Sequence, residues 1–273
     1  MREWLRRRWL VLVVAGWAVL LLVLGFAAYG GDATVPAQRD ILASRAVVDR
    51  ATVEVVNAAG ADAAVRVGGF EFVETCRISL VRDGVAYRRS IELYPASGGE
   101  ARLIETLARR LPAAYQARSF TLGGRPRLTG SADPYVPLRG SATGGVVRIV
   151  LRTDCHPAGG PLTTWRTTPS ETERGEAAEA LELTGGQERE PRWGTETIAC
   201  TSDASDETAL RAVRLRVAGA PARPLGDAAG LVPPDARVLV AGEKLLAYRR
   251  GAVSMVAETR GGHLELTTTT VRC

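Results

Sequence analysis

Histidine and lysine are almost absent from this sequence. Its 273 residues include two histidines, His156 and His263, and a single lysine, Lys244. No Cys-x-x-Cys or His-x-x-x-His pair is present, and zinc sites need about four ligands at short paired spacings, so we predict no metal site. A catalytic interpretation makes His156 a general base that Asp154 or Asp133 orients. Because both histidines adjoin glycine-rich turns, we expect exposed turn histidines instead.

Sequence motifs for nucleophilic catalysis and phosphate binding are missing as well. The segment Gly140–Gly144 has the glycines of a nucleophile elbow, but Ala142 occupies the position of the nucleophile. The segment Ala241–Lys244 lacks the upstream glycine and the Ser or Thr of a phosphate-binding loop. We therefore predict no catalytic or cofactor-binding residue and no cofactor. Paired carboxylates for sugar cleavage stay open, because the two members of such a pair can be distant in sequence.

Aromatic residues are scarce, and basic residues are not concentrated beyond the first few positions. Aromatic residues make up 5% of the chain and apolar residues 46%, so the core must consist mainly of Val, Leu, Ala and Ile. The formal net charge is +5, of which residues 1–8 carry +3. Nucleic-acid binding needs a concentrated basic face, and no basic run follows residue 8. We therefore predict no nucleic-acid partner.

One long uncharged run dominates the N-terminal part. Residues 9–29 form, as a helix, a span of roughly 31 Å, which matches the hydrocarbon core of a bilayer. Asp32 follows the run, and Trp9 and Tyr29 stand where aromatic belts occur. Four arginines precede it: Arg2, Arg6, Arg7 and Arg8. This asymmetry predicts a single-pass anchor in the plasma membrane with a cytoplasmic N-terminus and an extracytoplasmic bulk. The alternative is a cleaved signal peptide, which usually has a shorter apolar region and an Ala-x-Ala site.

The cysteines belong to an internal repeat. All four follow the uncharged run: Cys76, Cys155, Cys200 and Cys273. A proline lies 36 residues after the first cysteine and 33 after the third, and the next cysteine follows 43 and 40 residues later. A Gly-Gly pair precedes the final strand pattern of both copies. An oxidising compartment favours disulfides, so two copies predict the bridges Cys76–Cys155 and Cys200–Cys273. The alternative is a chance resemblance in a biased composition.

These features predict an α+β protein. A transmembrane helix precedes two divergent repeat units, each a mainly antiparallel sheet with at most one helix; a mostly-β exterior region is the alternative. We expect a cytoplasmic tail over 1–8, a transmembrane helix over 9–29, a spacer and helix over 30–60, a first unit over 61–156, an acidic linker over 157–194 and a second unit over 195–273.

Local patterns predict individual elements. A helix is expected from Pro36 to about Ala59, and a hairpin over 77–94 is expected to turn at Asp83–Gly84. Ser97 and Glu100 have capping-box spacing ahead of a helix that ends near Pro112. Alternation over 213–217 predicts a strand, and residues 237–272 predict a meander of short strands.

Two polar segments allow a functional and a structural interpretation. The run Thr267–Thr270 could present hydroxyls to a glycan, but an exposed strand face is the favoured interpretation. The acidic segment 157–194 could dock a partner, but a solvated linker with one or two exposed helical turns is favoured.

The combined expectation is a membrane-anchored exterior protein that binds or scaffolds another cell-envelope component without catalysis. Two alternatives stay open. One is an envelope hydrolase or transferase that uses carboxylates, or His156 with Asp154. The other is an accessory subunit of a larger membrane complex.

Overall fold

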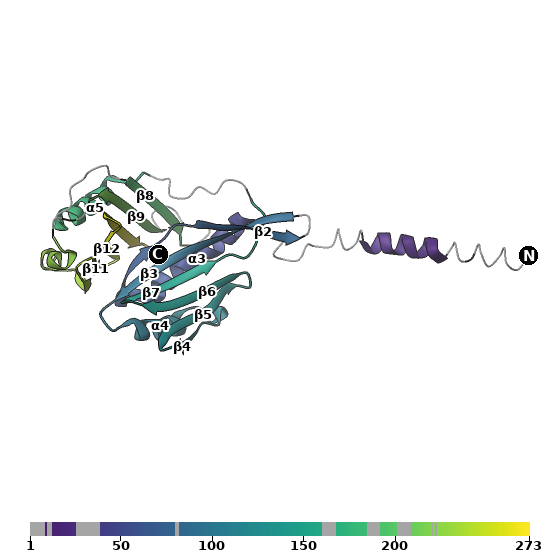
Figure 1. Cartoon of the computed structure of the whole chain (residues 1–273), viewed down its shortest axis with the longest axis horizontal. Coiled ribbons are helices and arrows are strands. Elements are labelled where there is room, and N and C mark those ends of the chain that lie inside the picture. The colour runs from purple at the N-terminus through teal and green to yellow at the C-terminus, as the bar shows by residue number, and fades with distance from the viewer. Residues whose placement is uncertain are drawn as a thin grey trace, which may run out of the picture.

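The protein contains two antiparallel sheets and few helices (Figure 1). This agrees with the α+β class that the sequence predicts. The computed structural model describes residues 9, 13–25, 39–79, 82–159, 168–184, 192–200, 209–219, 221 and 223–273. The first half contains α3 (Ile41–Ala59), η1 (Gly60–Asp62), β1 (Ala63–Val67), β2 (Glu71–Ser79), β3 (Arg82–Pro95), α4 (Glu100–Arg110), η2 (Ala113–Tyr115), β4 (Arg118–Leu122), β5 (Arg125–Asp133), β6 (Val136–Thr143) and β7 (Val146–Arg152). The second half contains α5 (Glu171–Leu183), β8 (Arg192–Ala199), β9 (Ala209–Ala218), η3 (Leu225–Leu231), β10 (Arg237–Ala241), β11 (Leu245–Arg250), β12 (Val253–Arg260) and β13 (His263–Val271).

The two sheets have the same strand order. The first sheet runs β1-β3-β7-β6-β5-β4, with β2 added beside β3. The second sheet, followed from its other edge, runs β8-β9-β13-β12-β11-β10. In both halves a helix precedes the first strand of this order, β1 or β8. A helical segment follows the second strand, β3 or β9, and the last strand of a four-strand meander then pairs with that second strand. The arrangement is therefore repeat-like, and β2 is the one strand of the first half with no counterpart among the described residues of the second.

In each half a disulfide joins the chain between the first two strands of the shared order to the chain just after the meander. Cys76 in β2 is bonded to Cys155, just after β7, with a Cα–Cα distance of 5.8 Å. Cys200, just after β8, is bonded to Cys273, just after β13, with a Cα–Cα distance of 5.6 Å. These are the two pairs that the repeat predicts, and such bonds fit an oxidising, extracytoplasmic environment.

The two long helices of the first half cover one face of its sheet. α3 begins at the N-cap Asp40, whose side chain accepts a hydrogen bond of 2.8 Å from the Ala43 amide, and it ends at Gly60, whose φ is +57°. This agrees with the helix expected to end near Ala59. α4 buries Leu103, Ile104 and Leu107 but has Gly99 as its N-cap with no side-chain cap, so the predicted capping box at Ser97 was wrong.

The hairpin of β2 and β3 turns earlier than the sequence predicts. Ser79 pairs with Arg82, whereas Asp83 and Gly84 lie inside β3, with Gly84 opposite Cys76. Close packing, and not a turn, requires glycine at position 84. A Cβ at Gly84 would lie 2.7 Å from the His156 carbonyl oxygen and 2.9 Å from the Cys155 Sγ.

Part of the expected solvated linker over 157–194 is a packed helix. α5 begins with a capping box in which the Ser170 amide donates to the Glu173 carboxylate over 2.7 Å. Its Ala177, Ala180 and Leu181 are buried in the core of the second sheet. The spacing of these small apolar residues places them on one helix face, and the acidic residues around them concealed that pattern. The linker residues 160–167 and 185–191 lie outside the described residues.

The threonine run is buried and not exposed. Thr267, Thr268 and Thr269 have almost no exposed surface, because β13 lies inside its sheet with α5 against one face and β1 against the other. The prediction of an exposed face was therefore wrong. The strand pattern itself is as expected, since β10–β13 form the predicted meander over 237–272.

Part of the uncharged run is helical. Residues 13–25 form a helix (Figure 1). Its large apolar side chains are exposed, and Trp9 is also exposed. Within the described ranges, no helix combines the length and the apolar composition that crossing a membrane requires. Five residues of the topology prediction lie outside those ranges: Arg2, Arg6, Arg7, Arg8 and Tyr29.

Replacement of Cys76 and Cys155 together by serine should lower the free energy of unfolding by about 4 kcal/mol. The reason is that a bridge across 79 residues restricts the unfolded chain. Urea denaturation of the full chain in a neutral detergent measures the change. Equal denaturation midpoints for variant and wild type would contradict it.

Candidate functional site

The two sheets meet where β1 lies against β11, β12 and β13. Ala64 and Tyr94, on the face of the first sheet opposite α3, pack with Leu239, Ala247 and Val256 of the second sheet. This apolar contact is small, and charged groups surround it. The junction between the sheets is therefore one place where residues from both halves of the chain come together.

Arg66 lies at the centre of the junction. It sits in β1 between Val65 and Val67, which enter the core on the helix side, so strand alternation points its side chain toward the second sheet. The side chain is 6% exposed. Its Nε donates to Glu92 Oε2 over 2.6 Å and its Nη1 to Glu258 Oε2 over 2.6 Å. One guanidinium thus joins β3 to β12.

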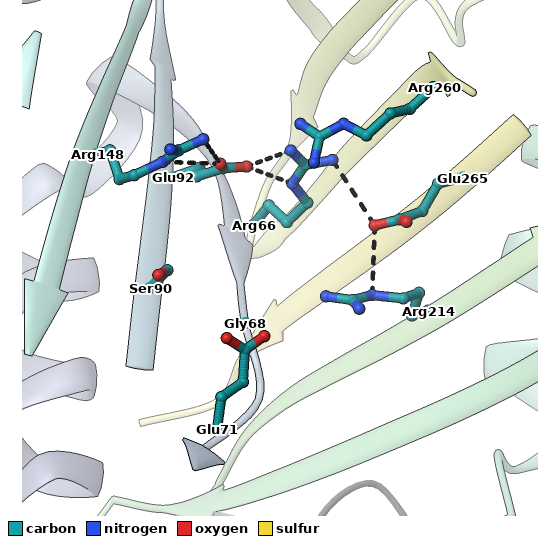
Figure 2. Close-up of a pocket in the computed structure, with 9 residues that line it drawn as sticks. All are labelled: Arg66, Gly68, Glu71, Ser90, Glu92, Arg148, Arg214, Arg260 and Glu265. Carbon is teal, nitrogen blue, oxygen red and sulfur yellow. Dashed lines mark hydrogen bonds and ion pairs between the residues drawn. The ribbon is translucent and has the colours of Figure 1, made fainter. Parts of the chain in front are cut away.

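Further ion pairs extend this group on both sides (Figure 2). Glu92 accepts two hydrogen bonds from Arg148 of β7, at 3.1 and 2.6 Å, and one of 2.9 Å from the Tyr94 hydroxyl. On the second sheet Glu265 lies 3.8 Å from Arg66 and 3.4 Å from Arg214 of β9. We call Arg66, Glu92, Arg148, Glu258, Glu265 and Arg214 the junction network.

Burial and charge shift the pKa values in this network. Burial works to raise the pKa of Glu92, but the charge of Arg66 and the hydrogen bonds from Arg66, Arg148 and Tyr94 hold it below its ordinary value. Burial works to lower the pKa of Arg66, but Tyr94, Glu92 and Glu258 hold it above its ordinary value. Burial raises the pKa of Tyr94. All three groups therefore keep one charge state over the physiological pH range.

Two cavities flank the network between the sheets, and we call them together the cleft. The first has a volume of about 230 Å³ and the second about 410 Å³. Arg66, Glu92, Arg148 and Arg260 line both of them. Gly68, Glu71, Ser90, Arg214 and Glu265 complete the first cavity. Tyr94, Ser141, Thr143, Gly144, Val146, Leu245 and Glu258 complete the second.

The carboxylates of the cleft are all in ion pairs. Glu92 and Glu258 contact Arg66, Glu265 contacts Arg66 and Arg214, and Glu71 contacts Arg88. Sugar cleavage needs one carboxyl group that keeps its proton near neutral pH, and the lowered pKa of Glu92 is the opposite condition. Glu92 therefore does not have the protonation state that the acid of such a pair needs.

The histidines and their proposed acidic partners lie away from the cleft. His156 is 1% exposed, because its backbone pairs with Val85 and its Nδ1 lies 3.2 Å from the Arg39 carbonyl oxygen. The prediction of an exposed turn was therefore wrong for His156. Asp154 is exposed, and Asp133 forms a 2.6 Å ion pair with Arg39. His263 is half-buried at the start of β13. Within the described part of the chain, no hydrogen bond or ion pair joins His156 to Asp154 or Asp133.

A second buried arginine joins the halves on the helix side. Arg89 of β3 has no exposed surface; it donates to Asp49 of α3 over 2.5 Å and also bonds to Glu196 of β8. Burial raises the pKa of Glu196, although Arg89 opposes the shift. Glu196 is enclosed and lines neither cavity of the cleft, so this contact is structural.

Sequence reasoning missed the junction network. One signal was available: Arg66 is the only charged residue in the apolar strand Ala63–Val67. A charge inside a buried strand needs a partner, but nothing in the sequence identifies Glu92 or Glu258, which are 26 and 192 residues away. Within the described parts of the chain no group of three or more His, Cys, Asp or Glu side chains could hold a metal ion.

Comparison with known protein families and with curated proteins finds no match to this chain.

The Arg66→Met variant should lose about 3–5 kcal/mol of unfolding free energy, because it removes the buried cation that Glu92 and Glu258 share and leaves them only the exposed Arg148 and Arg260. The matched control is Arg148→Met. Its side chain is 54% exposed, so its loss should be about 1 kcal/mol or less. Denaturant unfolding of both variants tests the difference. Equal losses would show that burial of Arg66 is not what makes its ion pairs important.

The Glu92→Gln variant should approach wild-type stability as the pH falls. The folded-state pKa of Glu92 is below its ordinary value, so its ionised form stabilises the fold above that value, and the contribution disappears as the pH falls through the folded-state pKa. The difference in unfolding free energy should therefore be largest near pH 7 and narrow toward pH 3. Glu71→Gln, at an exposed ion pair, is the control. A difference for Glu92→Gln that is independent of pH would contradict the prediction.

Proposed function

We propose that this protein is a membrane-anchored extracytoplasmic binding protein, which holds a polar cell-envelope component in the cleft between its two sheets and does not transform it. The uncharged run over 9–29, with the arginines before it, supports the anchor. Two disulfides in the two halves support an oxidising compartment for the bulk of the chain.

The observation that carries the binding role is the pairing of charges in the cleft. Ion pairs hold its charged side chains in fixed positions before any ligand arrives, so binding costs little side-chain ordering. Arg148 and Arg260, at 54% and 63% exposed, are the cations most accessible to a ligand. Ser141 and Thr143 add hydroxyls in the same cavity. This chemistry suits a ligand with a carboxylate or phosphate beside hydroxyl groups.

A cavity-filling variant tests the proposal. Leu245 lines the larger cavity from the second sheet, so Leu245→Trp should occupy the space that the ligand needs. Leu231→Trp is the matched control, because Leu231 is half exposed in η3 and lines neither cavity. The full chain in neutral detergent is dialysed against an isotope-labelled digest of envelope polymers, and the retained components are identified by mass.

We expect wild type and Leu231→Trp to retain the same component with unchanged mass, and Leu245→Trp to retain at least about tenfold less, a free-energy change of about 1.4 kcal/mol. A retained component that returns shortened by hydrolysis would favour the enzyme alternative. Equal retention by all three proteins would exclude the cleft as the binding site.

A further inference from the structure

The open face of the first sheet, opposite α3 and α4, is strongly basic. On the helix side, β5–β7 bury Leu128, Leu138 and Ile149. Strand alternation places six arginines of β4–β7 on the other side, and we call them the basic face: Arg118, Arg125, Arg127, Arg139, Arg148 and Arg152. Within these four strands, the residues that share this side include no Asp or Glu.

The strand register arranges these arginines in a staggered pattern. Two rows of directly opposed residues cross the strands: Arg118, Thr129, Arg139 and Val150 in the first, and Phe120, Arg127, Ser141 and Arg148 in the second. Adjacent strands are about 4.8 Å apart, so arginines two strands apart in one row are about 10 Å apart. On each of the four strands, one row has an arginine and the other row has a hydroxyl-bearing or apolar residue.

Carboxylates of the described chain form ion pairs only with the two arginines of the basic face that lie nearest β3. Glu92 holds Arg148, and Glu74 of β2 holds Arg152. The described residues supply no carboxylate within ion-pair distance of the other four arginines of the basic face. The Arg127 Nε is also shielded from solvent and donates to no described acceptor. Neighbouring like charges on a sheet destabilise one another, so an external anion would relieve the repulsion.

We propose that the basic face binds a linear polysaccharide that carries carboxylate or phosphate groups along its length. Arginines that recur every 10 Å or so in two rows can contact successive anionic groups of one extended chain. Phe120, half exposed at the end of the second row beside Arg127, adds an aromatic surface against which a sugar ring can pack. The proposal deepens the proposed function, because it names the ligand class and adds a second contact surface that meets the cleft at Arg148.

The shape of this surface favours a flexible chain over a bilayer. Figure 1 shows the first sheet extending away from the second in the order β3, β7, β6, β5 and β4. The second sheet packs over Ala64 and Tyr94, so the basic face ends in a corner beside Arg148. A flat bilayer cannot follow that corner, whereas an extended polymer can lie across the strands up to Arg148.

Binding of labelled polymers to the full chain in neutral detergent tests this inference. The probes are polygalacturonate and long-chain inorganic polyphosphate, with dextran as the neutral polymer. The test variant is Arg127→Gln with Arg139→Gln. Its matched control is Arg102→Gln with Arg109→Gln, which removes the same charge from exposed positions of α4 on the opposite side of the sheet. Fluorescence anisotropy at several salt concentrations gives the affinity and its salt dependence.

We expect the basic-face variant to bind at least one anionic polymer about tenfold more weakly than wild type at low salt, with a smaller salt slope, and the α4 variant to change affinity by less than about threefold. Dextran should not bind. Equal losses in the two variants would overturn the proposal, as would tighter binding of duplex DNA or of anionic phospholipid vesicles than of both polymers.

The cleft variant separates this proposal from the proposed function. Leu245→Trp leaves all six arginines in place, so it should bind the anionic polymer as wild type does. If Leu245→Trp binds the polymer normally and no cleft ligand is found, polymer binding at the basic face is supported and ligand binding in the cleft is contradicted. Retention of a cleft ligand without polymer binding would do the reverse.

Discussion

The arrangement of the two halves depends on Arg66. Removal of a guanidinium from water costs several kcal/mol, and only well-placed carboxylates with good hydrogen-bond geometry offset that cost. Glu92 comes from the same sheet as Arg66, whereas Glu258 and Glu265 come from the other sheet. Sliding one sheet over the other would separate the buried Arg66 from Glu258 and Glu265 and leave it only Glu92. The junction is therefore fixed by charge pairing, and the cleft that flanks it takes its shape from the same contact.

The two halves share a topology but use their surfaces differently. In the second sheet the face opposite α5 packs against β1. Side chains on this face, such as Leu210 and Ala212, belong to the same apolar core as the first sheet. In the first sheet the corresponding face is open over β4–β7 and carries arginines. The repeat-like arrangement thus provides one sheet as a support and the other as an accessible surface. Divergence of the outward-facing residues is sufficient for this, because alternate strand positions change without disturbing the helix-side core.

Local signals predicted much of the fold, whereas the candidate site depends on contacts that are distant in sequence. The helix ending at Ala59 and the meander over 237–272 follow from short-range patterns and glycines, and the disulfide pairs follow from the repeat. The cleft could not be predicted, because Arg66 meets its partners only when two separate sheets pack. The basic face escaped notice because its arginines occur singly, two apart or four apart on four strands, which is not a basic run. Predictions failed at His156 and Thr267–Thr269 for the same reason: their burial comes from segments that pack over them.

The start of the folded region is tied to a cross-linked part of the sheet. The Ile41 amide donates to the Pro157 carbonyl oxygen over 3.1 Å, and His156 contacts the Arg39 carbonyl oxygen. Both contacts lie directly after Cys155, which is covalently bonded to β2. A mechanical pull on the chain ahead of Arg39 would therefore be transmitted first to a disulfide-bonded ribbon that pairs along β3. Such a load path bypasses the second sheet, so the side of the cleft that the second sheet supplies would carry no direct tension.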